Sequence, residues 1–168
     1  NDLPVINAEL TDASGVVTEV AEALELEQPD NGTSGEIVFS DLDASDIPVV
    51  SSTSMAAVGE MYVGDFSVPS SATVGDAGFV VPWTFNVSEI DIDFLGVGDS
   101  LTQKYKVLIN DGTGTVEQIV TITINGTNDA PTIDATTDNK TGLEGADLLE
   151  STSTPIALTA SGKFTVQD

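Results

Sequence analysis

The chain has 168 residues and a formal net charge of −24, because 28 acidic side chains stand against four lysines and no arginine. This charge excludes nucleic acid and anionic membrane surfaces as main partners, since both are bound through basic side chains. The absence of histidine and cysteine excludes imidazole bases, cysteine nucleophiles, zinc and haem sites, and disulfides. We therefore expect no enzyme. No apolar run reaches the roughly 18 residues of a membrane span, so we expect no membrane insertion.

Short runs rich in β-branched and aromatic residues predict strands over residues 35–41, 59–68, 79–87, 101–110 and 116–124. Residues 18–28 consist of helix formers up to Pro29 but alternate in part, so helix and strand both stay open here. Residues 88–95 begin with Ser88, a favourable N-cap, and predict one helical turn before Gly96. Little is recognisable over residues 44–77.

Two of the predicted strands alternate clearly, and residues 110–114 join them as a hairpin. In the strand over residues 101–110, one face should point into the core, and it carries Leu101, Tyr105, Val107 and Ile109. In the strand over residues 116–124, the inward face carries Val116, Val120, Ile122 and Ile124. Trp83 and Phe85 are expected in the core of the strand over residues 79–87. Seven or more short strands at this spacing predict an all-β sandwich.

The sequence repeats itself at an offset of 127 residues. Asn1-Asp2-Leu3-Pro4-Val5-Ile6 resembles Asn128-Asp129-Ala130-Pro131-Thr132-Ile133, and residues 34–41 align with residues 161–168 without a gap. Nine of the 41 aligned positions are identical, whereas average composition would give roughly three. We interpret residues 1–127 as one full repeat, and residues 128–168 as the linker and opening strands of the next, which could also pack on the first.

Four segments resemble the VCBS repeat, a cadherin-like module of large bacterial surface adhesins secreted by the RTX route. These are GFVVPWTF (residues 78–85), FLGVGDSLT (residues 94–102), YKVLINDG (residues 105–112) and VTITINGTNDAP (residues 120–131). The resemblance implies an immunoglobulin-like or cadherin-like antiparallel Greek-key β-sandwich. It also implies a secreted, cell-surface extender module that takes part in adhesion or biofilm formation, has neighbouring repeats of the same chain as partners, and is a monomer.

The resemblance further implies where calcium would bind, because cadherin-like modules hold calcium at their junctions. Ligands implied at the junction after residue 127 are Glu19, Asp99, Asn128, Asp129 and Asp168. Those implied at the amino-terminal end are Asp2, Asp41, Asp43 and Asp111.

Calcium also suits the residues themselves, since it prefers carboxylate and carbonyl oxygens and would relieve the repulsion in Asp-Leu-Asp-Ala-Ser-Asp, residues 41–46. An EF-hand is excluded, because Asp46 stands where that loop needs glycine and Ser52 where it needs glutamate. Two other functions stay open. One is a ligand-binding adhesin domain that recognises a glycan or peptide through residues 44–77. The other is an assembly module that pairs with another copy through an exposed edge strand.

Overall fold

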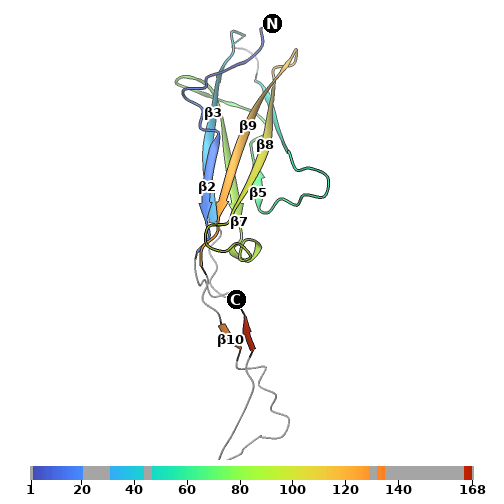
Figure 1. Cartoon of the computed structure of the whole chain (residues 1–168). Coiled ribbons are helices and arrows are strands. Elements are labelled where there is room, and N and C mark those ends of the chain that lie inside the picture. The colour runs from blue at the N-terminus through green and yellow to red at the C-terminus, as the bar shows by residue number, and fades with distance from the viewer. Residues whose placement is uncertain (1, 21–30, 44–46, 129–131, 135–164, 168) are drawn as a thin grey trace, which may run out of the picture. The chain divides into compact units, whose positions relative to one another are not determined.

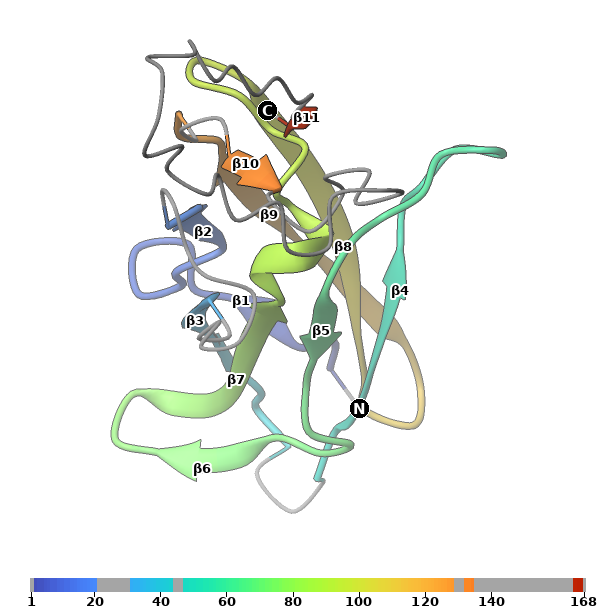
Figure 2. The same ribbon diagram turned by 90° about the horizontal axis from the view of Figure 1, so that it is seen from below.

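The computed structural model describes residues 2–20, 31–43, 47–128, 132–134 and 165–167. By its internal contacts the chain divides into two compact units, Asn1–Asn128 and Asp129–Asp168. The first unit consists of two β-sheets that face each other (Figures 1 and 2), with one short 3-10 helix, η1 (Glu89–Asp91), among its described residues.

The strand order of the two sheets defines the fold. One sheet has the order β1-β3-β7-β5, with β6 also on β7, and contains β1 (Val5–Ile6), β3 (Asn31–Ser40), β7 (Gly78–Val87), β5 (Asp65–Ser67) and β6 (Thr73–Gly75). The other has the order β2-β9-β8-β4 and contains β2 (Ser14–Thr18), β9 (Thr115–Asn125), β8 (Ser100–Asn110) and β4 (Val49–Ser54). This is the A-B-E-D and A′-G-F-C arrangement of an immunoglobulin-like sandwich with Greek-key connections. The predicted fold class is confirmed.

The chain changes sheets between its first two strands. β1 pairs with β3 in antiparallel fashion, whereas β2 pairs with β9 in parallel. Asn7 makes the turn between them: its carbonyl oxygen accepts the amide of Thr11 at 3.0 Å, and its side-chain Oδ1 accepts that of Glu9 at 3.1 Å. An asparagine at the first position of a turn satisfies backbone donors in this way.

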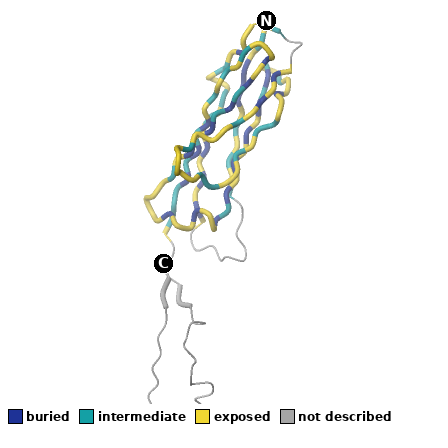
Figure 3. Tube along the Cα trace, turned by 90° about the vertical axis from the view of Figure 1, so that its right-hand side faces the viewer, coloured by how far each residue is buried: buried dark blue, intermediate teal, exposed yellow. Residues whose placement is uncertain are grey.

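The core lies between the sheets, where the buried residues concentrate (Figure 3). Tyr105, Val107 and Ile109 of β8 and Val120, Ile122 and Ile124 of β9 are buried as predicted, with Leu101 and Val116 packed against them. Trp83 and Phe85 of β7 are completely buried. The Trp83 indole Nε1 donates to the carbonyl oxygen of Asp12 at 2.7 Å, so the polar atom of the ring has a partner inside the core.

The middle of the chain differs from the prediction. The strand expected over residues 59–68 is wrong for the most part, because only β5 is extended there. Gly59 and Gly64 have φ values of +89° and +73°, a conformation that a strand does not allow. The helical turn expected over residues 88–95 is η1, which Ser88 precedes without a side-chain capping bond. Most of residues 18–28 lies outside the described residues, and β2 ends at Thr18.

The second unit contains one described strand pair, β10 (Thr132–Asp134) with β11 (Thr165–Gln167). Thr132 pairs with Gln167 and Ile133 with Val166. In the first unit Val5 pairs with Ser40 and Ile6 with Phe39. Each partner in the second unit lies 127 residues after its counterpart, so both units pair their opening strands in the same register.

Candidate cation-binding site

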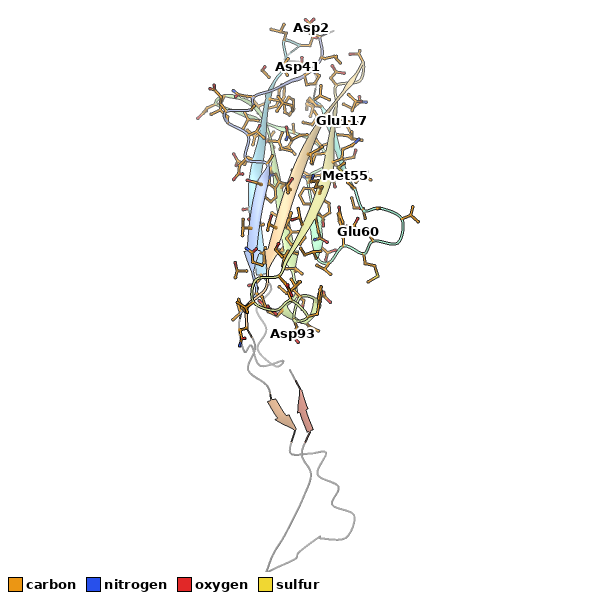
Figure 4. The ribbon with its side chains drawn as sticks, in the orientation of Figure 1. Asp2, Asp41, Met55, Glu60, Asp93 and Glu117 are labelled. Atoms are coloured by element: carbon orange, nitrogen blue, oxygen red, sulfur yellow. The ribbon has the colours of Figure 1, made fainter. Side chains whose placement is uncertain are left out.

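Three segments that each carry an aspartate lie at the end of the first unit where β3 ends. They are the first residues of the chain, the segment that follows β3, and the turn between β8 and β9. The backbone amide of Asp2 donates to the Asp43 carboxylate at 2.6 Å, and the amide of Asp43 donates to Asp41 Oδ1 at 2.9 Å. Asp2 and Asp41 lie at this end in Figure 4. These bonds tie the first residues of the chain to the segment that follows β3.

Asp111 occupies the turn between β8 and β9. Its Oδ1 accepts hydrogen bonds from the amides of Thr113 and Gly114, both at 2.7 Å. These amide groups, that of Gly114 first, hold the pKa of the Asp111 carboxyl below its usual value. The Asp111 side chain is only 8% exposed, so an ionised carboxylate lies almost entirely inside the protein.

Two carboxylate oxygens at this end are buried without a hydrogen-bond partner, Asp41 Oδ2 and Asp111 Oδ2. The turn that holds Asp111 packs against the segment that holds Asp2, because a side chain added at Gly114 would collide with Leu3. The described residues thus place Asp2, Asp41, Asp43 and Asp111 at one end of the sandwich, which we call the amino-terminal end. A buried ionised oxygen without a partner carries a large desolvation cost.

Two further carboxylates are buried at the opposite end, those of Glu19 and Glu89, which are 4% and 2% exposed. Glu19 Oε2 accepts the amide of Thr127 at 2.7 Å. Glu89 Oε2 accepts the amide of Val20 at 3.1 Å, and its Oε1 is bonded to the side-chain amide of Asn31. Glu89 thus bonds to the residue that directly follows Glu19.

Asp99 is the other acid expected at this end that the structure describes. Asp99 is exposed, and its Oδ2 accepts the amide of Gly96 at 3.2 Å, which closes the loop before β8. Its carbonyl oxygen accepts the amide of Gly126 at 3.1 Å. Asn128 is exposed, and Asp129 and Asp168 lie outside the described residues. Asp99 and Glu19 thus accept hydrogen bonds from two successive backbone amides, those of Gly126 and Thr127.

Glu89 is the buried acid that the sequence did not single out. An acidic residue after a serine at the start of a helical turn is ordinarily solvated, and nothing nearby in the sequence marks this one as buried. Its partners come from Val20 and Asn31, far away along the chain. Only the folded arrangement reveals its position.

Within the described ranges, no group of three or more acidic side chains is placed to hold a metal ion by itself. The two described lysines lie on β8, and Lys106 Nζ pairs with Glu117 at 3.0 Å. The buried oxygens of Asp41 and Asp111 fit a hard cation such as calcium in their chemistry. The rest of the coordination shell would have to come from carbonyl and water oxygens or from side chains outside the described ranges.

No protein-family model and no curated protein sequence matches this chain. Solved structures resemble it weakly. A chimeric titin Z1Z2 covers 73% of this chain and 94% of its own, with 11% identity and a TM-score of 0.37. The titin M3 domain covers 73% and 96%, with 10% identity and a TM-score of 0.38. AggA, the major subunit of aggregative adherence fimbriae type I from Escherichia coli, covers 75% and 96%, with 13% identity and a TM-score of 0.39.

Among the described residues, no helix has the length and apolar composition of a membrane span.

Proposed function

We propose that this chain is a calcium-binding structural module of a large secreted bacterial surface adhesin, without enzymatic activity. The observation that carries the proposal is the burial of two carboxylate oxygens without hydrogen-bond partners, Asp41 Oδ2 and Asp111 Oδ2. Cation binding at the amino-terminal end would give such an oxygen a ligand bond and would offset the cost of burying its charge.

The opposite end supports the same proposal through Glu19 and Glu89. Both carboxylates are nearly completely buried, and burying a carboxylate is costly unless a partner offsets its charge. The chain as a whole carries a charge of −24. A divalent cation would offset the burial cost and reduce the self-repulsion, which otherwise destabilises the compact state. We propose that Glu19 and Glu89 are the protein ligands at this end.

The extender role rests on the repeat. The offset of 127 residues relates the sequence of both units, and the pairs β1–β3 and β10–β11 share one register. Repetition of one fold along a chain builds length, and its stability is approximately a sum over units and their neighbours. The resemblance to VCBS repeats supports placement at a bacterial cell surface. Adhesion or biofilm formation would then be the task of the parent protein.

Calcium would act by linkage. An ion that binds only the folded state stabilises it by RT ln(1 + [Ca]/Kd). Extracellular modules commonly have Kd values of about 10⁻⁴–10⁻³ M. At about 5 mM calcium we therefore expect the Tm to rise by about 3–10 °C relative to EDTA. The module would fold more loosely at cytosolic calcium concentrations and more firmly outside the cell.

The test is a thermal melt in EDTA and in calcium, together with calorimetric titration. Asp111→Asn removes the charge at the amino-terminal end and keeps an oxygen that can accept the Thr113 and Gly114 amides. Glu89→Gln removes the charge at the opposite end and keeps an oxygen that can accept the Val20 amide. Each variant should lose part of the binding heat and part of the calcium-induced rise in Tm. Asp76→Asn, an exposed change on the turn after β6, is the matched control and should keep both. Equal Tm with and without calcium, and no binding heat, would refute the proposal.

A further inference from the structure

The chain enters the second sheet of the first unit through β2 and leaves the unit through β9, and these two strands are neighbours. They run parallel over five residue pairs. One further backbone hydrogen bond closes the ladder at each end: the Thr121 amide donates to Ala13 O at 3.0 Å, and the Glu19 amide donates to Asn125 O at 2.9 Å. A pull on the two ends of the chain therefore reaches this ladder from both sides.

The parallel pairing determines the direction in which the ladder is loaded. The chain before β2 comes from the amino-terminal end of the unit, whereas β9 ends at the opposite end (Figure 1). Opposed pulls on the chain before β2 and after β9 slide the two strands past each other along their length. The hydrogen bonds run across from one strand to the other, so they share the force and have to break together. Bonds loaded from one end of a ladder would instead break one after another.

The neighbouring strands make this ladder the place where the unit separates. β9 is held on its other side by β8 over eleven residue pairs, more than twice the five that hold β2. Within the described residues, β2 has no strand on its other side. Before β2, the chain is held by two residue pairs of β1 with β3, and by the amides of Asn7 and Asp12, which donate to Val38 O and Glu36 O, both at 2.8 Å. We therefore expect β2 to separate from β9 before β9 separates from β8.

Core packing adds to the resistance of β2. Val17 is only 4% exposed, and its side chain belongs to the core. A Cβ added at Gly15 would lie 2.5 Å from Thr33 Cγ2 and 3.0 Å from Trp83 Cη2, so the backbone of β2 lies directly against β3 and the indole ring. Protein interiors are close-packed, and β2 cannot slide along β9 without breaking these contacts. Hydrogen bonds and packing are therefore lost in the same step.

We propose that β2 and β9 form a mechanical clamp, which determines the force at which the first unit unfolds when the chain is pulled at its two ends. The use of such a clamp rests on the extender role proposed above, because a module that links a cell to a surface transmits force along its chain. The clamp itself consists of backbone hydrogen bonds and core packing. Because none of these interactions is a bond to a metal ion, the clamp is tested in EDTA.

The test is force spectroscopy of single full-length chains, with one handle at the amino-terminus and the other at one of two positions. A handle at the carboxy-terminus slides β2 along β9, and unfolding of the first unit then releases roughly 120 residues, or about 40 nm of chain. A handle on Thr115→Cys, at the exposed first residue of β9, loads the ladder from one end. The chain has no cysteine of its own. We expect the unfolding force between the termini to be about twofold higher or more.

A matched pair of variants tests the location of the clamp. Val17 on β2 and Val50 on β4 lie on the two edge strands of the same sheet, and both are 4% exposed. Val17→Ala and Val50→Ala should lower the Tm to a similar extent. At constant force between the termini, Val17→Ala should raise the unfolding rate by about tenfold, because its packing is lost in the step that limits unfolding. Val50→Ala should change that rate by less than about twofold.

Two results would overturn the clamp. One is an equal unfolding force in the two pulling directions, and the other is an equal effect of the two variants on the unfolding rate. Neither measurement involves calcium, so a chain that binds no calcium can still show the clamp. Equal forces in the two directions would likewise leave the calcium proposal standing.

Discussion

The side-chain amide of Gln103 forms two hydrogen bonds with the backbone of Val63. Its Oε1 accepts the Val63 amide at 2.6 Å, and its Nε2 donates to the Val63 carbonyl oxygen at 2.9 Å. Gln103 is completely buried on β8, so the pair acts as a short bridge between β8 and the segment before β5. It anchors the loop that projects between β4 and β5.

We expect Gln103→Met to destabilise the protein although the volume of the side chain is preserved. The substitution leaves the amide and carbonyl of Val63 without their partners, at a cost of about 2–4 kcal/mol in the free energy of unfolding. Urea denaturation measures this. Gln118→Met is the matched control, because Gln118 is partly exposed on β9 and bonds only to the carbonyl oxygen of Ile119. Equal stability of the two variants would show that the bridge contributes nothing.

The alternating pattern of β8 already indicated that the side chain of Gln103 is buried and has an internal hydrogen-bond partner. Gln103 stands between Leu101 and Tyr105 on the face of β8 that was predicted to be buried, and a polar residue on such a face needs an internal partner. The partner itself, Val63, could not be predicted. It belongs to a segment whose two glycines at positive φ, Gly59 and Gly64, interrupt the strand expected there.

Strands with one buried face were predictable, and edge strands were not. β8 and β9 alternate because one face of each packs on the core. β4 reads VVSSTS and is exposed along most of its length, so no alternation marks it. The local sequence marked only the acidic cluster of residues 41–46, and the resemblance added Asp2 and Asp111 at the amino-terminal end. Burial of Glu89 depends on Val20 and Asn31, which only the fold brings near.

The backbone of Gly35 lies directly against the indole ring of Trp83. A Cβ at Gly35 would lie 2.5 Å from Trp83 Cζ2 and 2.8 Å from the carbonyl oxygen of Asp12. The indole of Trp83 occupies the space that a side chain would need. The backbone of β3 therefore approaches the ring directly, and Asp12 O is also the acceptor of the indole Nε1.

We expect Gly35→Ala to lower the free energy of unfolding by about 1–3 kcal/mol, because the added methyl group overpacks the core. The fluorescence of Trp83, the single tryptophan, should change in the folded state as the ring moves. Gly96→Ala is the control, since a Cβ there would meet only Asp99 Oδ2, at an ordinary 3.6 Å. The explanation fails if Gly35→Ala is as stable as Gly96→Ala.

The phenol of Tyr105 should ionise at a higher pH than that of an ordinary tyrosine. Burial, followed by the neighbouring Tyr62 and Asp65, raises the pKa of its phenol to about 12. The folded pKa lies above the unfolded value of 10.0, so the stability that the neutral phenol contributes is complete below pH 10 and is lost as the pH rises toward 12. In the Tyr62→Phe variant Tyr105 is the single tyrosine. Its absorbance at about 295 nm should then report a midpoint well above 10 when folded and near 10 in guanidinium. A folded midpoint near 10 would contradict this.

Asp111 should stabilise the protein at neutral pH and cease to do so in acid, even without calcium. The Gly114 and Thr113 amides hold the folded pKa below the ordinary value of 3.8. A depressed pKa contributes stability above the unfolded value, and that contribution is lost as the pH falls through the folded pKa.

We therefore expect Asp111→Asn in EDTA to be less stable than the parent at pH 7. The difference should begin to shrink as the pH falls below about 4, and it should vanish below the folded pKa of Asp111. Urea denaturation at several pH values measures the gap. In calcium the difference in stability at pH 7 should be larger, because the variant also loses a calcium ligand. Acid should remove this calcium-dependent part of the difference as well, since a protonated carboxyl no longer binds the ion. A gap that is independent of both pH and calcium would assign Asp111 a role in the turn alone.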